Sequence, residues 1–293
     1  MSTIVPEAVL PPERRGHEAA ADLVARRSSA ATMAGLALAG LSPAPREQQV
    51  GGRPTLRFTP ATPSDTTIIH FHGGGFRQGC PGQVAGYAAR LAARSGAEII
   101  CPTYRLAPEH PFPSGLLDGW SVIAALARES GRRLVLAGDS AGAGIAAALA
   151  LLCVRAAVPL AGLILHSPWL DLTLTSAGYE RNAAHDPLFS RSLAQAAAQA
   201  YLQGHDPRDP FASPLFAALN GFPPTLLTVG LGEVLADDSL RFEQRLTQQG
   251  IAVRLVAIDG MDHVAVVRDG NLPGAPATFA ATVAFLASLK AEG

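Results

Sequence analysis

The segment Gly138-Asp139-Ser140-Ala141-Gly142 decides the fold, because it directly follows the apolar run Leu134-Val135-Leu136-Ala137 and precedes an apolar helical segment. This G-x-S-x-G pattern predicts a strand, a tight turn and a helix, with Ser140 on the turn. Glycines suit such a turn, since larger side chains would collide with the adjoining strand or helix. Ser140 is therefore predicted to be a nucleophile beside the unpaired N–H groups of a helix N-terminus. The alternative is a Ser/Gly turn that only begins a helix.

A second motif, His72-Gly73-Gly74-Gly75, follows a strand-like segment at residues 66–71. Three consecutive glycines cost conformational entropy, so they indicate a backbone that must approach another group closely. A loop of this kind upstream of the serine turn predicts an oxyanion hole built from backbone N–H groups. A flexible glycine hinge is the alternative, but the order of the two motifs and the strand before each argue against it.

The chain thereby resembles the hormone-sensitive-lipase-like esterases, a family of α/β-hydrolases with an H-G-G-G loop. The resemblance spans about residues 20 to 288 and rests on residues 72–75, 104–113, 138–142, 167–171 and 260–263. It implies an α/β-hydrolase fold and an oxyanion hole that includes the N–H groups of Gly74 and Gly75. Ala141, the residue after the nucleophile, is expected to supply a further N–H group. Within the motif before Gly74, His72 and Gly73 shape the loop, His72 through a hydrogen bond.

Composition excludes several functions. The chain has 293 residues, of which 48% are hydrophobic, enough for a large single core. Its formal net charge of −1 does not suggest a nucleic-acid partner. The three cysteines are an odd number without paired spacing, which argues against a disulfide framework. No Cys/His cluster has metal-ligand spacing, so we expect no metal and no other cofactor.

The expected location is the cytoplasm. Residues 1–16 lack the basic segment and apolar core of a signal peptide. The longest apolar stretch, residues 141–154, is too short to span a bilayer. The expected partner is a small-molecule ester, and a homodimer is left open.

Strands alternate with helices after residue 65, which predicts a mostly parallel sheet covered by helices on both faces. The expected strands are residues 55–58, 66–71, 98–101, 133–137, 163–165, 225–229 and 253–258. The expected helices are residues 17–41, 82–95, 118–129, 141–154, 190–202 with Ser190 as N-cap, 238–249 and 277–290.

Two segments do not fit this alternation, residues 1–45 and residues 171–218. We expect them to form the two parts of a mainly helical cap over the active site. The second segment contains two turn signals, Asp186-Pro187 and Asp206-Pro207. Residues 46–170 and 219–293 then make up the α/β-hydrolase catalytic domain.

A serine nucleophile needs a base, and in this fold the chain order is serine, acid, histidine. His166, His185, His205 and His263 follow Ser140. His166 precedes any acid-bearing loop, and His185 and His205 fall in the expected cap. His263 follows the last predicted strand and is therefore the predicted base.

The acid is expected in the loop after residues 225–229, where the side chain of Glu233 can reach back to the histidine. The family's D-x-L-x-D pattern aligns with Glu233-Val234-Leu235-Ala236-Asp237, so this chain has Glu at the first position. Asp237 and Asp238 lie where a helix begins, a place where Asp is favoured as an N-cap. Glu233 is the predicted acid, and Asp237 and Asp259 are the alternatives.

Together these residues predict a serine carboxylesterase, and the resemblance implies esters of short- to medium-chain acids as substrates. An amidase or N-acyl acetylhydrolase with the same triad is one alternative. The alternative from another class is a non-catalytic small-molecule receptor, since the plant gibberellin receptors share this family's scaffold. Such receptors lack the triad histidine, whereas this chain has His263.

Overall fold

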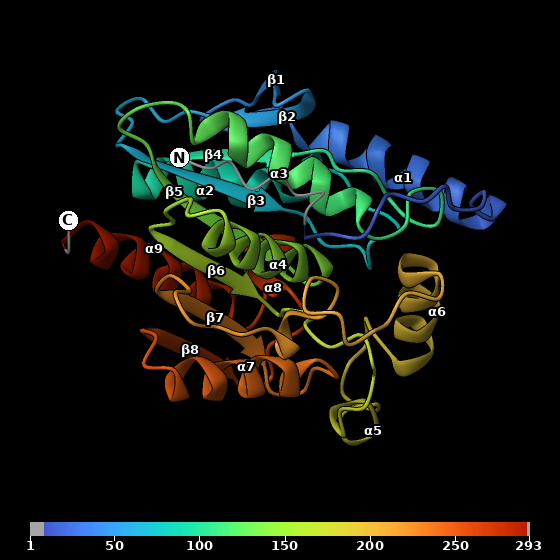
Figure 1. Ribbon diagram of the computed structural model, residues 1–293. Helices are drawn as coiled ribbons and strands as arrows, with labels where there is room; N and C mark the ends of the chain where they lie inside the picture. The colour runs from blue at the N-terminus through green and yellow to red at the C-terminus, as the bar shows by residue number, and fades with distance from the viewer. Residues whose placement is uncertain (1–8, 292–293) are drawn as a thin grey trace.

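A central eight-stranded sheet organises the molecule (Figure 1). The computed structural model describes residues 9–291. Residues 1–8, which belong to the expected cap and to the segment without signal-peptide features, lie outside the described part. In spatial order the strands are β1 (Arg46–Val50), β2 (Arg53–Phe58), β4 (Glu98–Pro102), β3 (Thr66–Phe71), β5 (Arg133–Asp139), β6 (Gly162–His166), β7 (Thr225–Gly230) and β8 (Val253–Ile258). β1 and β2 pair antiparallel, as do β2 and β4, and the strands from β4 to β8 pair in parallel. The mostly parallel sheet is thus confirmed.

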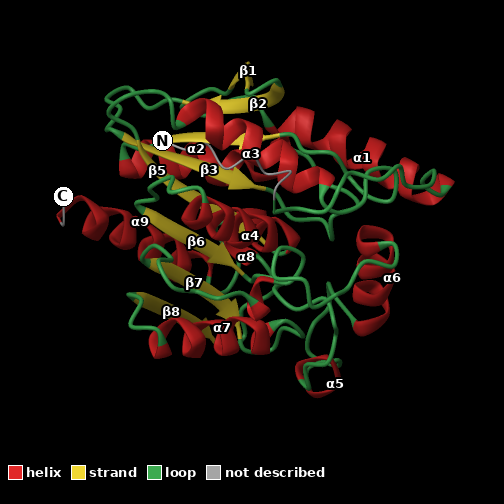
Figure 2. Cartoon of the chain, in the orientation of Figure 1, coloured by secondary structure: helices red, strands yellow, loops and turns green. Residues whose placement is uncertain are grey.

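Helices cover both faces of this sheet (Figure 2). One face packs against α3 (Ser114–Leu126), α4 (Ala141–Arg155) and α7 (Ala236–Gln248), and the other against α2 (Ala85–Ser95), α8 (Ala265–Arg268) and α9 (Ala275–Ala291). Along β5, Leu134 and Leu136 belong to the first core, while Val135 and Ala137 belong to the second. Successive strand residues point to opposite faces, so a continuous apolar run serves both cores.

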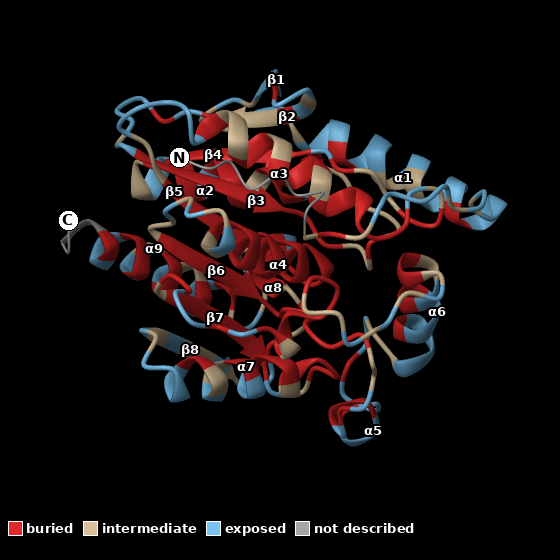
Figure 3. Ribbon diagram, in the orientation of Figure 1, coloured by how far each residue is buried: buried red, intermediate tan, exposed pale blue. Residues whose placement is uncertain are grey.

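Burial is concentrated in the strands and the inner helix faces (Figure 3). Every residue of β3, β4, β6 and β7 is buried, whereas the outer surfaces of α1 (Ala21–Ala37) and α7 are largely exposed.

Two of the cysteines, Cys101 and Cys153, are buried, and all three are free thiols. Burial raises the pKa of both buried thiols, so neither carries the thiolate that reacts.

The segments outside the alternation carry α1, α5 (Gly178–Arg181) and α6 (Arg191–Leu202). α5 and α6 lie beyond the carboxyl ends of β6 and β7, on the side to which the arrowheads point (Figure 2). The Ser190 hydroxyl accepts the Leu193 N–H, which confirms the predicted N-cap of α6. From α1, the Arg27 guanidinium donates to the Glu109 carboxylate and to the carbonyl of Arg77. The assignment of these segments to a cap stays a prediction.

Several element boundaries differ from the expected ones. β1 was not predicted, because four of its five residues are exposed polar side chains without apolar alternation. The helix expected at residues 118–129 is α3, which begins at Ser114, because Asp118 lies within the helix and binds Arg105 instead of starting the helix. The helix expected at residues 82–95 begins as a 3₁₀ turn, η2 (Pro81–Val84), and continues as α2; a second such turn, η3 (Pro214–Phe216), precedes β7.

In residues 9–291, no helix is both long enough and apolar enough to cross a membrane. Over the same residues, no three His, Cys, Asp or Glu side chains are grouped so that they can hold a metal ion.

Candidate active site

Ser140 occupies a strained turn between β5 and α4. Its φ of 53° and ψ of −123° are unusual for a residue with a side chain. A Cβ at Gly138 would lie 2.4 Å from the Gly142 carbonyl oxygen, and a Cβ at Gly142 would lie 2.1 Å from that of Phe71. Both glycines of the pattern are therefore required by close backbone contacts. Ser140 is also the N-cap residue of α4, but its side chain makes no capping bond, so its hydroxyl is available for another partner.

That partner is His263, from the loop between β8 and α8. The Ser140 Oγ lies 3.0 Å from His263 Nε2, and His263 Nδ1 lies 2.6 Å from Glu233 Oε2. An ionised carboxylate only accepts hydrogen bonds, so Nδ1 carries the proton and Nε2 accepts from the serine hydroxyl. The structure thus brings together the three residues predicted from the sequence. They come from the carboxyl ends of β5, β7 and β8, which share one edge of the sheet.

Two further groups hold the Glu233 carboxylate. Its Oε1 accepts the Ser167 hydroxyl at 2.8 Å and the Gly230 N–H at 2.5 Å. The Ser167 Oγ also accepts the Val264 N–H at 3.1 Å, so it connects the acid to the residue after the histidine. Sequence reasoning gave Ser167 no role, although it lies in a segment that carries the family resemblance.

His263 is buried, and burial alone would disfavour its protonated form. The neighbouring Glu233 carboxylate outweighs this through charge and a direct hydrogen bond, so the pKa of His263 is raised above its ordinary value. Asp186 and Asp139 act in the same direction through their charges.

The glycine loop lies against the serine. A Cβ on Gly73 would lie 3.2 Å from the Ser140 Cβ and 2.4 Å from Asp139 Oδ2. The Gly73 N–H donates to Asp139 Oδ2 at 3.0 Å, which ties the loop to the residue before the serine. Gly74 and Gly75 both have positive φ, 118° and 61°. In the described chain, the N–H groups of Gly74, Gly75 and Ala141 donate to no protein acceptor, so they remain available to a ligand.

His72 shapes this loop, as expected. Its Nδ1–H donates to the Gly73 carbonyl at 2.8 Å, and its ring stacks on Tyr104 with centroids 4.4 Å apart. The Tyr104 hydroxyl donates to the His72 carbonyl at 2.7 Å. Burial lowers the pKa of His72 to about 4, so the ring is neutral at physiological pH and serves as a support.

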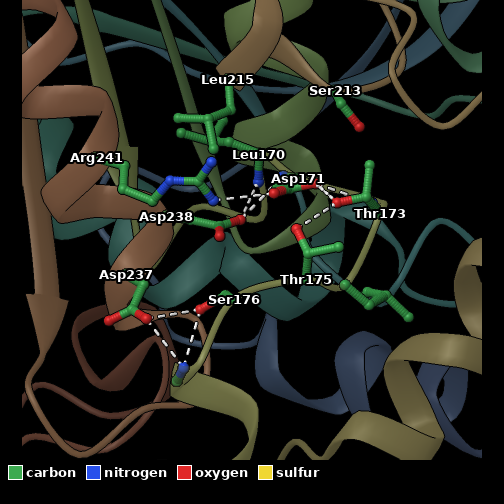
Figure 4. Close-up of polar contacts among 12 residues, drawn as sticks. Leu170, Asp171, Thr173, Thr175, Ser176, Ser213, Leu215, Asp237, Asp238 and Arg241 are labelled. Atoms are coloured by element: carbon green, nitrogen blue, oxygen red, sulfur yellow. Dashed lines mark hydrogen bonds and ion pairs between the residues drawn. The ribbon is translucent and has the colours of Figure 1, made fainter.

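The alternative acids lie away from His263. Asp237 accepts hydrogen bonds from the Ser176 hydroxyl and the Gly178 N–H, and Asp238 accepts from the N–H groups of Leu170 and Asp171 (Figure 4). Asp259 is exposed. The expectation that Asp237 or Asp238 caps a helix is wrong. The N-cap of α7 is Leu235, and both aspartates lie in the first turn, where they bind the segment at residues 170–178 instead.

An aromatic cluster covers the serine turn. Phe76, directly after the glycine loop, stacks on Tyr201 of α6 at a centroid distance of 3.9 Å and lies 5.4 Å from Trp169. The backbone N–H of Trp169 donates to the Ser140 carbonyl at 3.1 Å, so this wall is attached to the nucleophile's backbone.

Comparison with known proteins identifies the family of this chain. Residues 68–267 match a family model described as the α/β-hydrolase fold. An esterase from Acinetobacter venetianus is 38% identical over 77% of this chain and 76% of its own length. An acetyl-hydrolase from Streptomyces hygroscopicus is 34% identical over 80% of this chain and 79% of its own. A crystal structure of a hormone-sensitive lipase from a metagenome library superposes with a TM-score of 0.85 at 30% identity, covering 93% of each chain.

The fold and these similarities define the class: the chain is an α/β-hydrolase. Within that class it belongs to the hormone-sensitive-lipase-like family and is a carboxylic ester hydrolase.

Proposed function

We propose that the chain is a serine carboxylesterase that hydrolyses esters of short- to medium-chain acids through an acyl-enzyme on Ser140. The observation that carries the proposal is the hydrogen-bonded series Ser140–His263–Glu233 beside a glycine loop with free N–H groups. Nucleophile, base and acid in this relation activate a hydroxyl that is otherwise a weak nucleophile at neutral pH.

In the first half of the reaction, the Ser140 Oγ attacks the ester carbonyl carbon while His263 Nε2 takes the hydroxyl proton. The Glu233 carboxylate stabilises the imidazolium that forms, without accepting its proton. The carbonyl oxygen becomes an oxyanion, which the N–H groups of Gly74, Gly75 and Ala141 stabilise. As the C–O bond of the ester breaks, His263 gives its proton to the leaving alcohol.

In the second half, water replaces the alcohol. His263 takes a proton from the water as its oxygen attacks the acyl-enzyme, and the same N–H groups stabilise the second oxyanion. Collapse releases the carboxylic acid and returns the proton to Ser140. No step needs a redox or group-transfer partner.

We propose that the buried aromatic residues Phe76, Trp169 and Tyr201, which pack on one another next to the serine turn, form a wall that limits the length of the acyl group. An acetyl-hydrolase among the relatives supports a small acyl group too, and also keeps N-acyl substrates as a second candidate.

A series of p-nitrophenyl esters from acetate to palmitate tests the proposal. We expect kcat/KM to be highest for short to medium acyl chains. Each methylene that enters an apolar pocket contributes about 0.8 kcal/mol, so kcat/KM should rise with chain length and then fall where the wall stops the chain. Matched N-acetyl anilides should be hydrolysed far more slowly. A maximum at palmitate would refute the acyl range, and anilide rates equal to the ester rates would favour the N-acyl alternative.

The pH dependence of kcat/KM tests the base. His263 must be neutral to accept the serine proton, and its pKa is raised by Glu233 against the effect of burial. Activity should therefore fall as pH decreases through a value above the ordinary imidazole pKa of about 6.5, and should be full at alkaline pH. A stopped-time assay of each ester from pH 5 to 9 measures this. A profile that is flat across this range would exclude His263 as the base.

A further inference from the structure

A short stretch of the segment expected to form the cap, residues 178–189, lies against the loop that carries the acid. We name this stretch the α5 turn. The Asn182 Nδ2 donates to the Leu231 carbonyl at 2.9 Å and to the Glu233 carbonyl at 2.7 Å. Asn182 is buried, and its bond to the Glu233 carbonyl is shielded from solvent. The α5 turn thus holds the backbone of the acid itself.

Asp186 makes a second connection from the same turn. Its Oδ2 accepts the Val234 N–H at 3.0 Å, directly after Glu233. Its Oδ1 accepts the N–H groups of Leu188 and Phe189 at 3.0 and 2.9 Å. Asp186 is buried, with 9% of its surface exposed, and its carboxylate connects the acid loop to the end of the α5 turn.

The residue held at that end, Phe189, lies over the base. Its ring is nearly parallel to the His263 imidazole, with an interplanar angle of 9° and centroids 6.0 Å apart. Its other neighbour is Trp169, edge to face at 5.3 Å. Rings at such separations attract one another and restrict each other's orientation. The Asp186 carboxylate therefore binds the backbone next to Glu233 and also holds Phe189, whose ring packs on His263.

We propose that Asp186 is a positioning residue, which holds Glu233 and, through Phe189, His263 in the geometry needed for proton transfer from Ser140. This inference rests on the proposed function. Asp186 acts through other residues and touches no reacting atom. One of its two oxygens binds the backbone next to Glu233, and the other binds the backbone of Phe189, which packs on His263. A change at Asp186 therefore alters the surroundings of both the acid and the base.

Asp186 also contributes charge near the base. The titratable and charged groups that face or adjoin His263 are Glu233 after β7, Asp139 at the end of β5, Asp186 in the α5 turn, Asp262 directly before His263, and Arg268 of α8, which donates to the His263 carbonyl. Burial lowers the pKa of His263, and the three carboxylates Glu233, Asp186 and Asp139 raise it. Loss of the Asp186 charge should therefore lower this pKa.

The chain offers a matched pair of variants, Asp186→Asn and Asp206→Asn. Both aspartates precede a proline in the same segment, and each accepts the N–H two residues ahead. Asp206 is exposed, and over residues 9–291 no hydrogen bond or ion pair joins its side chain to the acid loop. In Asp186→Asn, the new amide keeps the shape of the side chain, but it removes the charge and the second carboxylate oxygen, so one of the two connections loses its acceptor.

We expect Asp186→Asn to lower kcat by about 10-fold to 10²-fold, the scale of a catalytic group displaced by a fraction of an ångström to an ångström, with little change in KM. The decrease of kcat/KM in acid should move to lower pH in this variant. Asp206→Asn should have the same kcat and the same pH dependence as the parent protein. Active sites are titrated with a phosphonate ester, so that kcat refers only to folded, reactive protein, and thermal unfolding by circular dichroism is measured for each variant.

Parent-like kcat and pH limb in Asp186→Asn would overturn the proposal. If that variant fails to fold, Phe189→Leu provides the test, because it keeps an apolar side chain and every charge: kcat should fall while the pH limb stays in place, and a parent-like kcat would overturn the positioning role. Ser140→Ala in the same assay separates the two proposals. An inactive Ser140→Ala beside a parent-like Asp186→Asn rejects only the positioning role, whereas an active Ser140→Ala rejects the proposed function.

Discussion

We expect Ser140→Ala to lower kcat for p-nitrophenyl butyrate by a factor on the order of 10⁵–10⁶, provided that chemistry limits turnover. The variant loses the hydroxyl that lies 3.0 Å from His263 Nε2, and no acyl-enzyme can then form. The residual rate should come from the oxyanion hole and binding alone. The fold should persist, since the Ser140 side chain makes no capping bond to α4 and an alanine fits the same space.

The matched control for this variant is Ser121→Ala. The Ser121 hydroxyl bonds within its own helix, to the Asp118 carbonyl at 2.7 Å, so its loss should leave kcat unchanged. A phosphonate ester followed by peptide mass spectrometry should find the adduct on Ser140 in the parent and no adduct in Ser140→Ala. Adduct on a different serine, or substantial turnover by Ser140→Ala, would refute the proposed nucleophile.

We expect Glu233→Gln to lower kcat by about 10⁴-fold, the scale seen when the triad acid of a serine hydrolase becomes an amide. The amide can present an N–H group to His263 Nδ1, which favours the wrong tautomer and leaves Nε2 protonated, so it cannot accept the serine proton. It also removes the negative charge that stabilises the imidazolium. KM should change little, because the acid does not touch the substrate.

Asp237→Asn is the control that separates the two carboxylates of the E-x-L-x-D segment. Asp237 binds Ser176, Gly178 and Arg181, and it has no contact with His263. Its replacement should lower the unfolding temperature and leave kcat near the parent value. The reverse pattern, with Asp237→Asn inactive and Glu233→Gln active, would reassign the acid.

Much of the fold could be predicted because its signals are local. The apolar run Leu134–Ala137 of β5 is buried on both faces, so it is continuous and stands out in the sequence. The glycines around Ser140 are required by backbone contacts within a few residues or with the adjacent strand, and they mark the turn without knowledge of the rest. β1 gave no such signal, because backbone pairing with β2 holds it while its side chains face solvent.

In the candidate site, too, some residues could be predicted from local signals and others could not. Ser140, Glu233 and His263 could be named because each follows a strand, and the order of strands fixes the order of the three groups along the chain. Ser167, Asn182 and Asp186 could not be assigned roles. Each is a polar loop residue whose partner lies about 50 to 100 residues away, and neither periodicity nor turn chemistry indicates such a contact.

The place of β8 in the sheet has a consequence for inactivation. β8 pairs with β7 alone in the described chain, at the outer edge of the sheet, and His263 follows it by five residues. Edge elements open with a smaller free energy than central ones, because fewer contacts must be broken. Fraying of this one strand separates the base from the nucleophile while the central strands and both cores stay intact. We therefore expect turnover in denaturant to be lost before secondary structure, so that residual activity is the more sensitive measure of damage to this molecule.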